Sequence, residues 1–431
     1  MSLNVSLEKA RIYMGRYAHS ADGVSDGAGL VPKVRSALFL GLLAWLLITA
    51  AYRGALNTGD VITGIDFEIF YDTAARWNHG LPLYQPHGQL YAYSPLLALI
   101  LRPLAMTSLG AALKIWFCFS AACLVLSVLV YGAAARMKWS DAASLGIMLV
   151  TGFRFWPTTM NFALGQLNFL MLLLLCSMFW ADNRRKPVLL GILIGFAALF
   201  KIWMLGLLLY PLLKRQWSAV TAAIGLCVLA FPLLFTLAGW REFPAFLQAS
   251  VSTSRQVSRI SITHSLFGFM HLHFQANSLL DPISTNGILY AAFLLAGLAG
   301  IGYGYWLLWK NRDFSPYYQR LSLGLIAVSV LLLLPPCQNE YLVLCLPLLW
   351  TMIAPAESGS TDRQIPMMLW GWGIYLMFSR GWGPYAPVPT AYHHGWRSIL
   401  VSTGFLAMSA LWLVGVLFLR RRRNFQTLAQ E

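Results

Sequence analysis

Long apolar runs alternate along this chain with short polar segments. The runs cover residues 36–56, 110–134, 140–153, 165–181, 187–213, 217–239, 287–309, 321–335, 341–356, 366–380 and 398–419. Most are long enough to cross a bilayer as a helix, and they are too long for barrel strands. In lipid, only helices and closed barrels satisfy all their backbone hydrogen bonds. The pattern therefore predicts an all-α multi-pass membrane protein with about 10–12 transmembrane helices.

Composition and charge agree with this class. Charged residues make up 11% of the chain, whereas an ordinary soluble domain has about 25%. Most of the Lys and Arg residues lie in one set of loops and at the two ends, as the positive-inside rule describes for cytoplasmic segments. The net charge of +15 therefore reflects topology, and we expect no nucleic-acid partner.

The same charge asymmetry predicts the domain organisation. We expect a cytoplasmic N-terminal segment at residues 1–35, a transmembrane domain at 36–419 and a basic cytoplasmic tail at 420–431. Extracytoplasmic loops are then expected at 57–109, 240–286 and 381–397. If the protein catalyses a reaction, we expect the active site to lie in these loops.

Three segments depart from simple spans. Residues 187–213 carry basic clusters at both ends, which predicts two half-length helices that meet near Lys201. Residues 91–106 are apolar but short and contain Pro95 and Pro103, which favours a re-entrant or interfacial helix. The sequence "HSLFGFMHLHF" within 240–286 predicts another helix in the interface.

Acidic residues are scarce, with 16 in the chain, yet several gather just after the first apolar run. A carboxylate at the outer end of a membrane helix is commonly a solvated anchor, and Asp60, Glu68 and Asp72 fit that interpretation. Asp66 differs because an ordered set of residues follows it. These are an aromatic pair at 70–71, a small residue at 74, a Gly-x-x-x-Tyr at 80–84 and "YAYSPLLALILRPL" at 91–104.

This order of residues resembles glycosyltransferase family 87. Further segments resemble the family in the same order: "ALGQLNFLMLLLL" (163–175), "LLGILIGFAALFKIWMLGLLLYPLLKRQW" (189–217) and "LLLLPPCQNEYLVLCLPLLW" (331–350). The resemblance covers roughly residues 60–350. Two positions depart from the family pattern: His264 stands where relatives often have Gln, and Asn339-Glu340 stand where they often have His.

The resemblance implies a C-type (GT-C) integral membrane glycosyltransferase in the plasma membrane, with its active site on the extracytoplasmic side. It implies transfer of a sugar, with mannose expected, from a polyprenyl-phosphate donor to a lipid-linked or envelope glycan acceptor. Such a hexosyltransferase inverts the anomeric carbon and needs one base, because a lipid phosphate leaves without an acid. The family motif assigns that base to Asp66. We expect no metal or other cofactor, since no metal-ligand spacing is visible.

The leaving phosphate needs cations or donors, and the candidates are Arg154, Lys201, Arg255, Arg259 and His264. Each also has a simpler interpretation as an interfacial anchor, except that a mid-membrane Lys201 usually faces a functional cavity. Gln166 and Asn168 fit either substrate binding or interhelical hydrogen bonds. Asn339 and Glu340 fit either acceptor binding or an ordinary wet turn.

A transporter or flippase for lipid-linked glycans is the alternative function. It predicts paired repeats, and none is visible in the sequence. Motifs clustered in loops on one face favour the enzyme.

Overall fold

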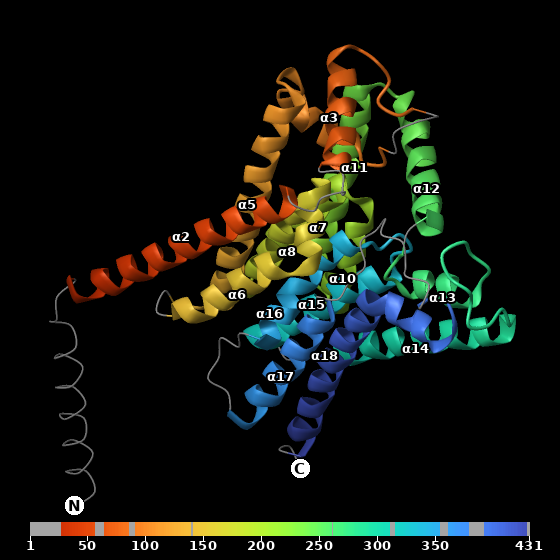
Figure 1. The fold of residues 1–431 in the computed structure, drawn as a ribbon. Coiled ribbons are helices and arrows are strands. Elements are labelled where there is room, and N and C mark those ends of the chain that lie inside the picture. The colour runs from red at the N-terminus through yellow and green to blue at the C-terminus, as the bar shows by residue number, and fades with distance from the viewer. Residues whose placement is uncertain are drawn as a thin grey trace, which may run out of the picture.

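The computed structural model describes residues 27–56, 64–85, 91–138, 141–260, 262–310, 315–353, 361–378 and 392–428. Within these ranges, the side chains of residues 27–33, 35, 53–56, 254–260, 361–365, 396 and 421–428 are not described. Every regular element in the described ranges is helical, which confirms the predicted all-α fold (Figure 1).

The elements follow one another as α2 (Gly27–Leu56), α3 (Ile65–Asn78), α4 (Pro95–Leu101), η1 (Leu104–Met106), α5 (Leu109–Ala134), α6 (Ala142–Arg154), α7 (Trp156–Leu164), α8 (Asn168–Asn183), α9 (Pro187–Phe200), η3 (Ile202–Leu208), α10 (Leu209–Leu213), α11 (Trp217–Ala238), α12 (Glu242–Ile260), α13 (Leu266–Phe274), α14 (Gly287–Lys310), α15 (Pro316–Leu333), η4 (Asn339–Cys345), α16 (Leu346–Ile353), α17 (Thr361–Phe378), η6 (Gly395–Ser402) and α18 (Thr403–Leu428).

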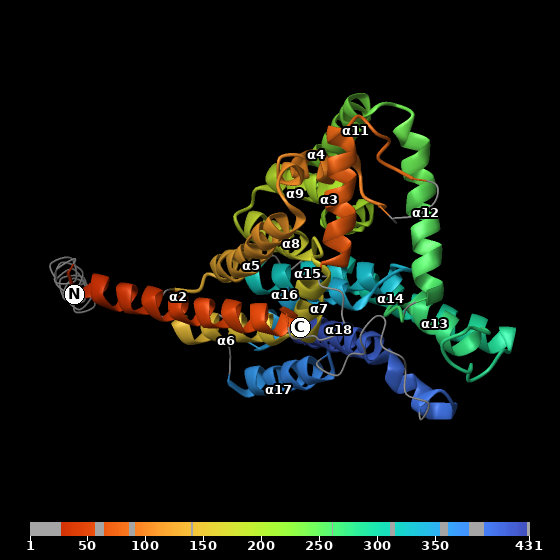
Figure 2. The same ribbon diagram turned by 45° about the horizontal axis from the view of Figure 1, so that its top comes forward.

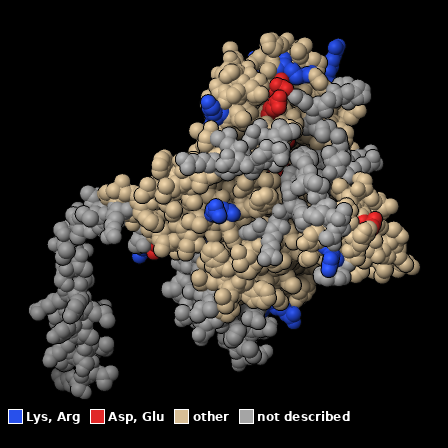
Figure 3. Space-filling view, viewed as in Figure 1, with Lys and Arg blue, Asp and Glu red and all other residues tan. Residues whose placement is uncertain are grey.

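Membrane-spanning character is present in long and short helices. Among the described residues, five helices are long and apolar enough to cross a membrane, namely Leu109–Ala134, Trp217–Ala238, Gly287–Lys310, Pro316–Leu333 and Arg397–Arg420. Shorter apolar helices, including α6, α8 and α9, supplement them. The surface in Figure 3 agrees, because it is largely uncharged and its charged side chains are scattered. The chain is a multi-pass membrane protein.

The helix pair α9 and α11 packs through small residues. Gly191 and Gly195 lie one turn apart on α9 and face Ala219 and Ala223 of α11. A Cβ atom added to Gly191 would lie 2.0 Å from the Ala219 carbonyl oxygen. Small residues at this spacing let helix backbones approach closely in membranes. This contact fixes the segment that leads into Lys201.

The predicted break at Lys201 is confirmed. Helix α9 ends at Phe200, Lys201 has an extended backbone, and the 3₁₀ helix η3 begins at Ile202. A second 3₁₀ segment, η4, lies against it, with the rings of Trp203 and Tyr341 5.7 Å apart. Irregular backbone at membrane depth is tolerated where it is buried in protein or lines a cavity.

The described part of the loop predicted at 57–109 contains helices α3 and α4 and the short 3₁₀ helix η1. Helix α4 confirms the short helix expected within 91–106, and α13 confirms the one expected within 240–286. Asp66 was expected where the first long helix ends, but it lies in the first turn of a separate helix, α3. Gly64, the residue just before α3, has a left-handed backbone conformation with a φ of 83°. Glycine adopts this conformation without strain, and the chain turns into the helix there.

Helices α3 and α12 lie at the end of the molecule away from the C-terminus, and α2 projects from the bundle (Figures 1 and 2). The Glu242 carboxylate at the start of α12 accepts hydrogen bonds from the backbone N–H groups of Leu83 (3.1 Å) and Tyr84 (3.2 Å). Helix α12 is thereby tied to the segment that follows α3.

The first and last long helices extend beyond the apolar runs predicted at 36–56 and 398–419. Helix α2 begins at Gly27, and α18 continues through the basic run to Leu428. Arginine is a good helix former, so a helix passes through such a run without a break. The sidedness of both ends stays a prediction.

Candidate functional site

The first turn of α3 is fixed onto the turn between α7 and α8. The Gly64 N–H donates a hydrogen bond to the Ala163 carbonyl at 2.6 Å. Phe67 packs so closely on Gly165 that a Cβ atom there would lie 2.6 Å from the Phe67 Cβ. Gly165 itself has a positive φ of 71° as the residue that ends α7. Both glycines are therefore needed to place Asp66 beside the start of α8.

Asp66 is held by a short chain of hydrogen bonds. Gln166 Nε2 donates to Asp66 Oδ2 at 2.7 Å, and the Tyr93 hydroxyl donates to Gln166 Oε1 at 3.1 Å. The tyrosine fixes the orientation of the amide, and the amide then presents its N–H to the carboxylate. One oxygen of Asp66 is bound in this way, and the half-buried side chain keeps contact with the outside.

The environment of Asp66 suits a general base. Burial raises the pKa of Asp66 to about 6, against the opposing effects of the Gln166 hydrogen bond and the Lys201 charge. The carboxylate is therefore ionised at neutral pH, yet it is a stronger proton acceptor than an ordinary aspartate. A pKa near the working pH is what proton transfer requires.

Lys201 lies in the break between α9 and η3 with its ammonium group enclosed. Its Nζ donates to Asn168 Oδ1 at 2.8 Å, and only 4% of the residue is exposed. The ammonium also lies 4.1 Å from the ring centre of Tyr341 and 5.3 Å from that of Tyr93. Two aromatic faces and an amide thus replace the water that a charged group loses on burial.

Glu340 lies in the first turn of η4 and is 1% exposed. Its backbone carbonyl accepts hydrogen bonds from Asn161 Nδ2 (2.6 Å) and Asn168 Nδ2 (3.2 Å). Neither oxygen of its carboxylate accepts a hydrogen bond from another described residue, while Lys201 and Asp66 are its charged neighbours. A buried carboxylate that lacks donors is costly, and hydroxyl groups of a bound sugar would supply them.

The buried side chain of His264 lies next to Asn339, the first residue of η4. The backbone N–H of His264 donates to the Cys337 carbonyl at 2.6 Å, and the imidazole packs on Gly404. Burial lowers the pKa of His264 to about 4, although the Asn339 side chain counteracts the shift. The imidazole is therefore neutral at neutral pH, so it carries no positive charge with which to attract a phosphate.

The remaining candidates are placed elsewhere or not described. Arg154 is exposed at the end of α6, where Tyr375 is its electrostatic neighbour, and no contact among the described residues joins it to Asp66 or Lys201. Arg255 and Arg259 share a face near the end of α12, because the stretch is helical. Their side chains, and Asp60 as a whole, lie outside the described part of the chain.

Three site residues were not predicted from the sequence: Tyr93, Asn161 and Tyr341. Tyr93 stands in the "YAYSP" segment and Tyr341 next to Glu340, so both were near a predicted motif. Tyrosine is common at membrane interfaces. The local sequence therefore does not distinguish a tyrosine that covers a buried ammonium group from one that anchors the protein in the interface. Asn161 lies within an apolar stretch, and its partner Glu340 is 179 residues away.

The described residues contain no group of three or more His, Cys, Asp or Glu side chains arranged to hold a metal ion. Metal-independent transfer stays a prediction.

A comparison with family models places this chain. The model for glycosyltransferase family 87 matches residues 91–336, which is more than half of the chain. The chain belongs to glycosyltransferase family 87. Gln166, Asn168, Lys201 and His264 lie within the matched residues, whereas Asp66 lies before them.

Curated relatives of this family 87 protein transfer two kinds of sugar. An alpha-(1->3)-arabinofuranosyltransferase from Corynebacterium glutamicum is 26% identical over 72% of this chain and 71% of its own length. A second alpha-(1->3)-arabinofuranosyltransferase, from Mycolicibacterium smegmatis, is 25% identical over 75% and 73%. A polyprenol-phosphate-mannose-dependent alpha-(1-2)-phosphatidylinositol mannoside mannosyltransferase from Mycobacterium tuberculosis is 30% identical over 49% and 55%. The protein is therefore a membrane glycosyltransferase.

Proposed function

We propose that this family 87 protein transfers a sugar from a polyprenyl-phosphate donor to a hydroxyl group of a lipid-linked or envelope glycan acceptor. Transfer takes place on the extracytoplasmic face of the plasma membrane and inverts the anomeric carbon. The observation that carries the proposal is the group of Asp66, Gln166, Lys201 and Glu340, which the fold assembles in an otherwise apolar protein.

The geometry supports a single-base mechanism. The Asp66 oxygen that does not bind Gln166 accepts the proton of the acceptor hydroxyl, while the hydroxyl oxygen attacks the anomeric carbon. The bond from this carbon to the phosphate oxygen breaks, and its electron pair leaves with the lipid phosphate. Gln166 keeps the carboxylate oriented, and the Lys201 charge favours the negative phosphate that forms. The Glu340 carboxylate accepts hydrogen bonds from sugar hydroxyls.

Mannose is the proposed sugar, as the resemblance implied. The arabinofuranosyltransferase relatives cover more of the chain than the mannosyltransferase does, so a polyprenyl-phosphate arabinose is the second donor to test. The transporter alternative has no support of this kind, because the relatives above are named as transferases.

Asp66→Asn tests the proposal, since the amide keeps the shape and still accepts the Gln166 hydrogen bond, but cannot take a proton. With purified protein, we expect the transfer rate to fall roughly 100- to 10,000-fold, while donor binding survives. Asp72→Asn on the same helix is the matched control and should retain most activity. If Asp66→Asn stays active while Glu340→Gln is inactive, the base has been assigned wrongly.

A further inference from the structure

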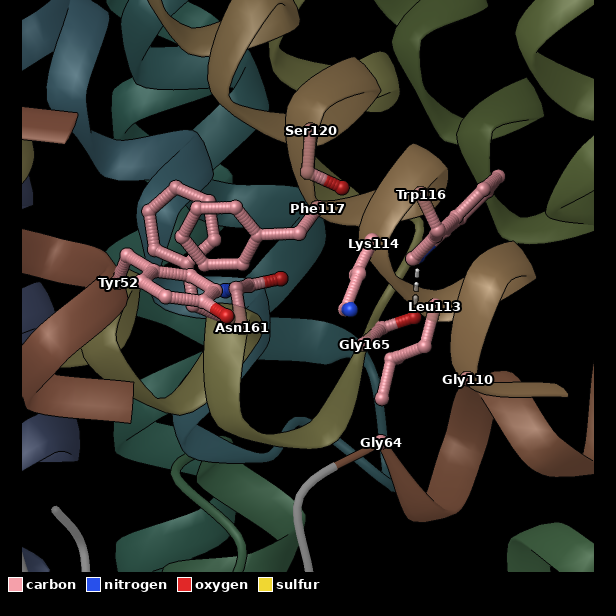
Figure 4. A pocket seen from close by; sticks show the side chains of 11 residues that line it. Tyr52, Gly64, Gly110, Leu113, Lys114, Trp116, Phe117, Ser120, Asn161 and Gly165 are labelled. Atoms are coloured by element: carbon pink, nitrogen blue, oxygen red, sulfur yellow. Dashed lines mark hydrogen bonds between the residues drawn. The ribbon is translucent and has the colours of Figure 1, made fainter. Parts of the chain in front are cut away.

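A small apolar pocket adjoins the site of Asp66. It has a volume of about 220 Å³ and lies between the end of α2, the first half of α5 and the end of α7 (Figure 4). Aromatic and aliphatic side chains form most of its wall, namely Tyr52, Leu113, Trp116, Phe117 and Phe162. Gly64 and Gly165 also line it, and these two residues hold Asp66 and Gln166 in place. The pocket and the site thus share a wall.

Two polar groups face this pocket without a partner among the described residues. The Lys114 side chain extends between Asn161 and Gly165 (Figure 4), and no hydrogen bond or ion pair joins it to another described residue. Asn161 is fully buried, and its Oδ1 has no hydrogen-bond partner. Its Nδ2 is held by the carbonyls of Pro157 (2.8 Å) and Glu340 (2.6 Å), so the oxygen is oriented. The pocket therefore offers a cation and a fixed acceptor.

The two lysines near the site differ in how their charge is balanced. Lys201 is already bound to Asn168, covered by tyrosine rings and influenced by Glu340 and Asp66. Lys114 has no such neighbours in the described part of the chain. Lys114 is exposed, so water screens its charge, but an anion that binds there does not compete with a protein carboxylate.

We propose that this pocket binds the phosphate and the nearest isoprenoid carbons of the polyprenyl-phosphate donor, with Lys114 contacting the phosphate. This inference rests on the proposed function and adds where the donor lipid binds. Small-molecule pockets usually measure about 300–1,000 Å³, so a cavity of about 220 Å³ takes this part of the lipid alone. Asn161 Oδ1 accepts a hydrogen bond from a sugar hydroxyl on the other side of the phosphate.

The position of the pocket along α5 fits a lipid. Lys114 is five residues from Leu109, where α5 begins, and this is about 8 Å along the helix axis. Ile115 and Phe119, on the same stretch of helix, are 53% and 41% exposed. These apolar side chains offer a surface along which the rest of the polyprenyl chain leaves the pocket for the bilayer.

Binding of sugar-free polyprenyl phosphate to purified protein in detergent tests the proposal. Lys114→Met removes the charge and keeps the length, so we expect Kd to rise about tenfold or more, and Lys114→Arg should recover most of the affinity. Gly110→Leu should also weaken binding, because a larger side chain would enter the pocket that Gly110 lines. The fold should tolerate this change, since a Cβ atom at Gly110 meets no atom within 4 Å. Lys310→Met, at the exposed end of α14, is the control and should bind normally.

The outcomes separate this proposal from the proposed function. Unchanged binding by both Lys114→Met and Gly110→Leu, with normal sugar transfer by the unmodified protein, overturns the pocket alone. Failure of the unmodified protein to bind polyprenyl phosphate or to use its sugar conjugate overturns both. Phosphatidylglycerol or inorganic phosphate that binds with the same dependence on Lys114 shows a general lipid or anion site and also overturns the proposal.

Discussion

Replacing Lys201 by methionine would leave the buried carboxylate of Glu340 without its neighbouring cation. The variant also loses the 2.8 Å hydrogen bond to Asn168 and the contact of the ammonium with the Tyr341 ring at 4.1 Å. Methionine has nearly the same length, so the space stays filled and the lost charge is the main perturbation. We therefore expect a loss of stability as well as a loss of activity.

The magnitude follows from the burial of both groups. No direct ion pair joins Lys201 to Glu340 among the described residues, although each is a charged neighbour of the other. The loss should therefore stay below the about 3–5 kcal/mol that removing one partner of a contacting buried pair costs. The hydrogen bond to a charged group (about 1.5–3 kcal/mol) and the cation–π contact (up to about 2 kcal/mol) are part of this cost and do not add to it. The double variant Lys201→Met/Glu340→Gln also removes the Glu340 charge. It should be more stable than the sum of the single variants predicts, by about 1–3 kcal/mol.

Thermal unfolding of the purified protein in detergent measures this double-mutant cycle, and transfer from polyprenyl-phosphate sugar measures function. We expect a lowered Tm for Lys201→Met, partial recovery of Tm in the double variant, and no recovery of activity. Lys310→Met serves as the matched lysine control. A Tm of Lys201→Met equal to that of the unmodified protein would refute the reasoning, as would strict additivity in the double variant.

Two further predictions concern the base and the packing beneath it. Because burial raises the pKa of Asp66 to about 6, the base is protonated below that pH. The kcat/KM should therefore fall about tenfold per pH unit below this pKa. Gln166→Leu removes a hydrogen bond that lowers the pKa of Asp66, so it should move the acid limb of the pH profile to higher pH. An acid limb that stays in place would contradict the assignment of Asp66. Gly191→Leu should lower Tm, at a cost of about 1–3 kcal/mol, because its Cβ would meet the Ala219 carbonyl at 2.0 Å. Gly300→Leu is the control, since it meets no atom within 4 Å, and an equal Tm for both variants would count against close packing there.

The sequence by itself determined the class of protein and the places where regular helices fail. Hydropathy depends on neighbouring residues alone, so the apolar runs predicted helices directly. Basic clusters at both ends of 187–213 were enough to predict the break at Lys201, because both clusters favour the cytoplasmic side and two half-length helices bring them there. The order of family-like residues also selected Asp66, Gln166 and Asn168, and it marked Glu340 as a departure from the family pattern.

Tertiary structure decided which of these residues meet. Gln166 and Asp66 are 100 residues apart, and Asn168 and the Glu340 carbonyl are 172 apart, so no local pattern encodes either contact. The fold also placed Arg154 on the exposed end of α6. Lys114 was not selected from the sequence, where it is a single lysine within an apolar run. Its proposed role comes from the pocket that α2, α5 and α7 form beside its exposed side chain, and such a pocket is a product of packing in three dimensions.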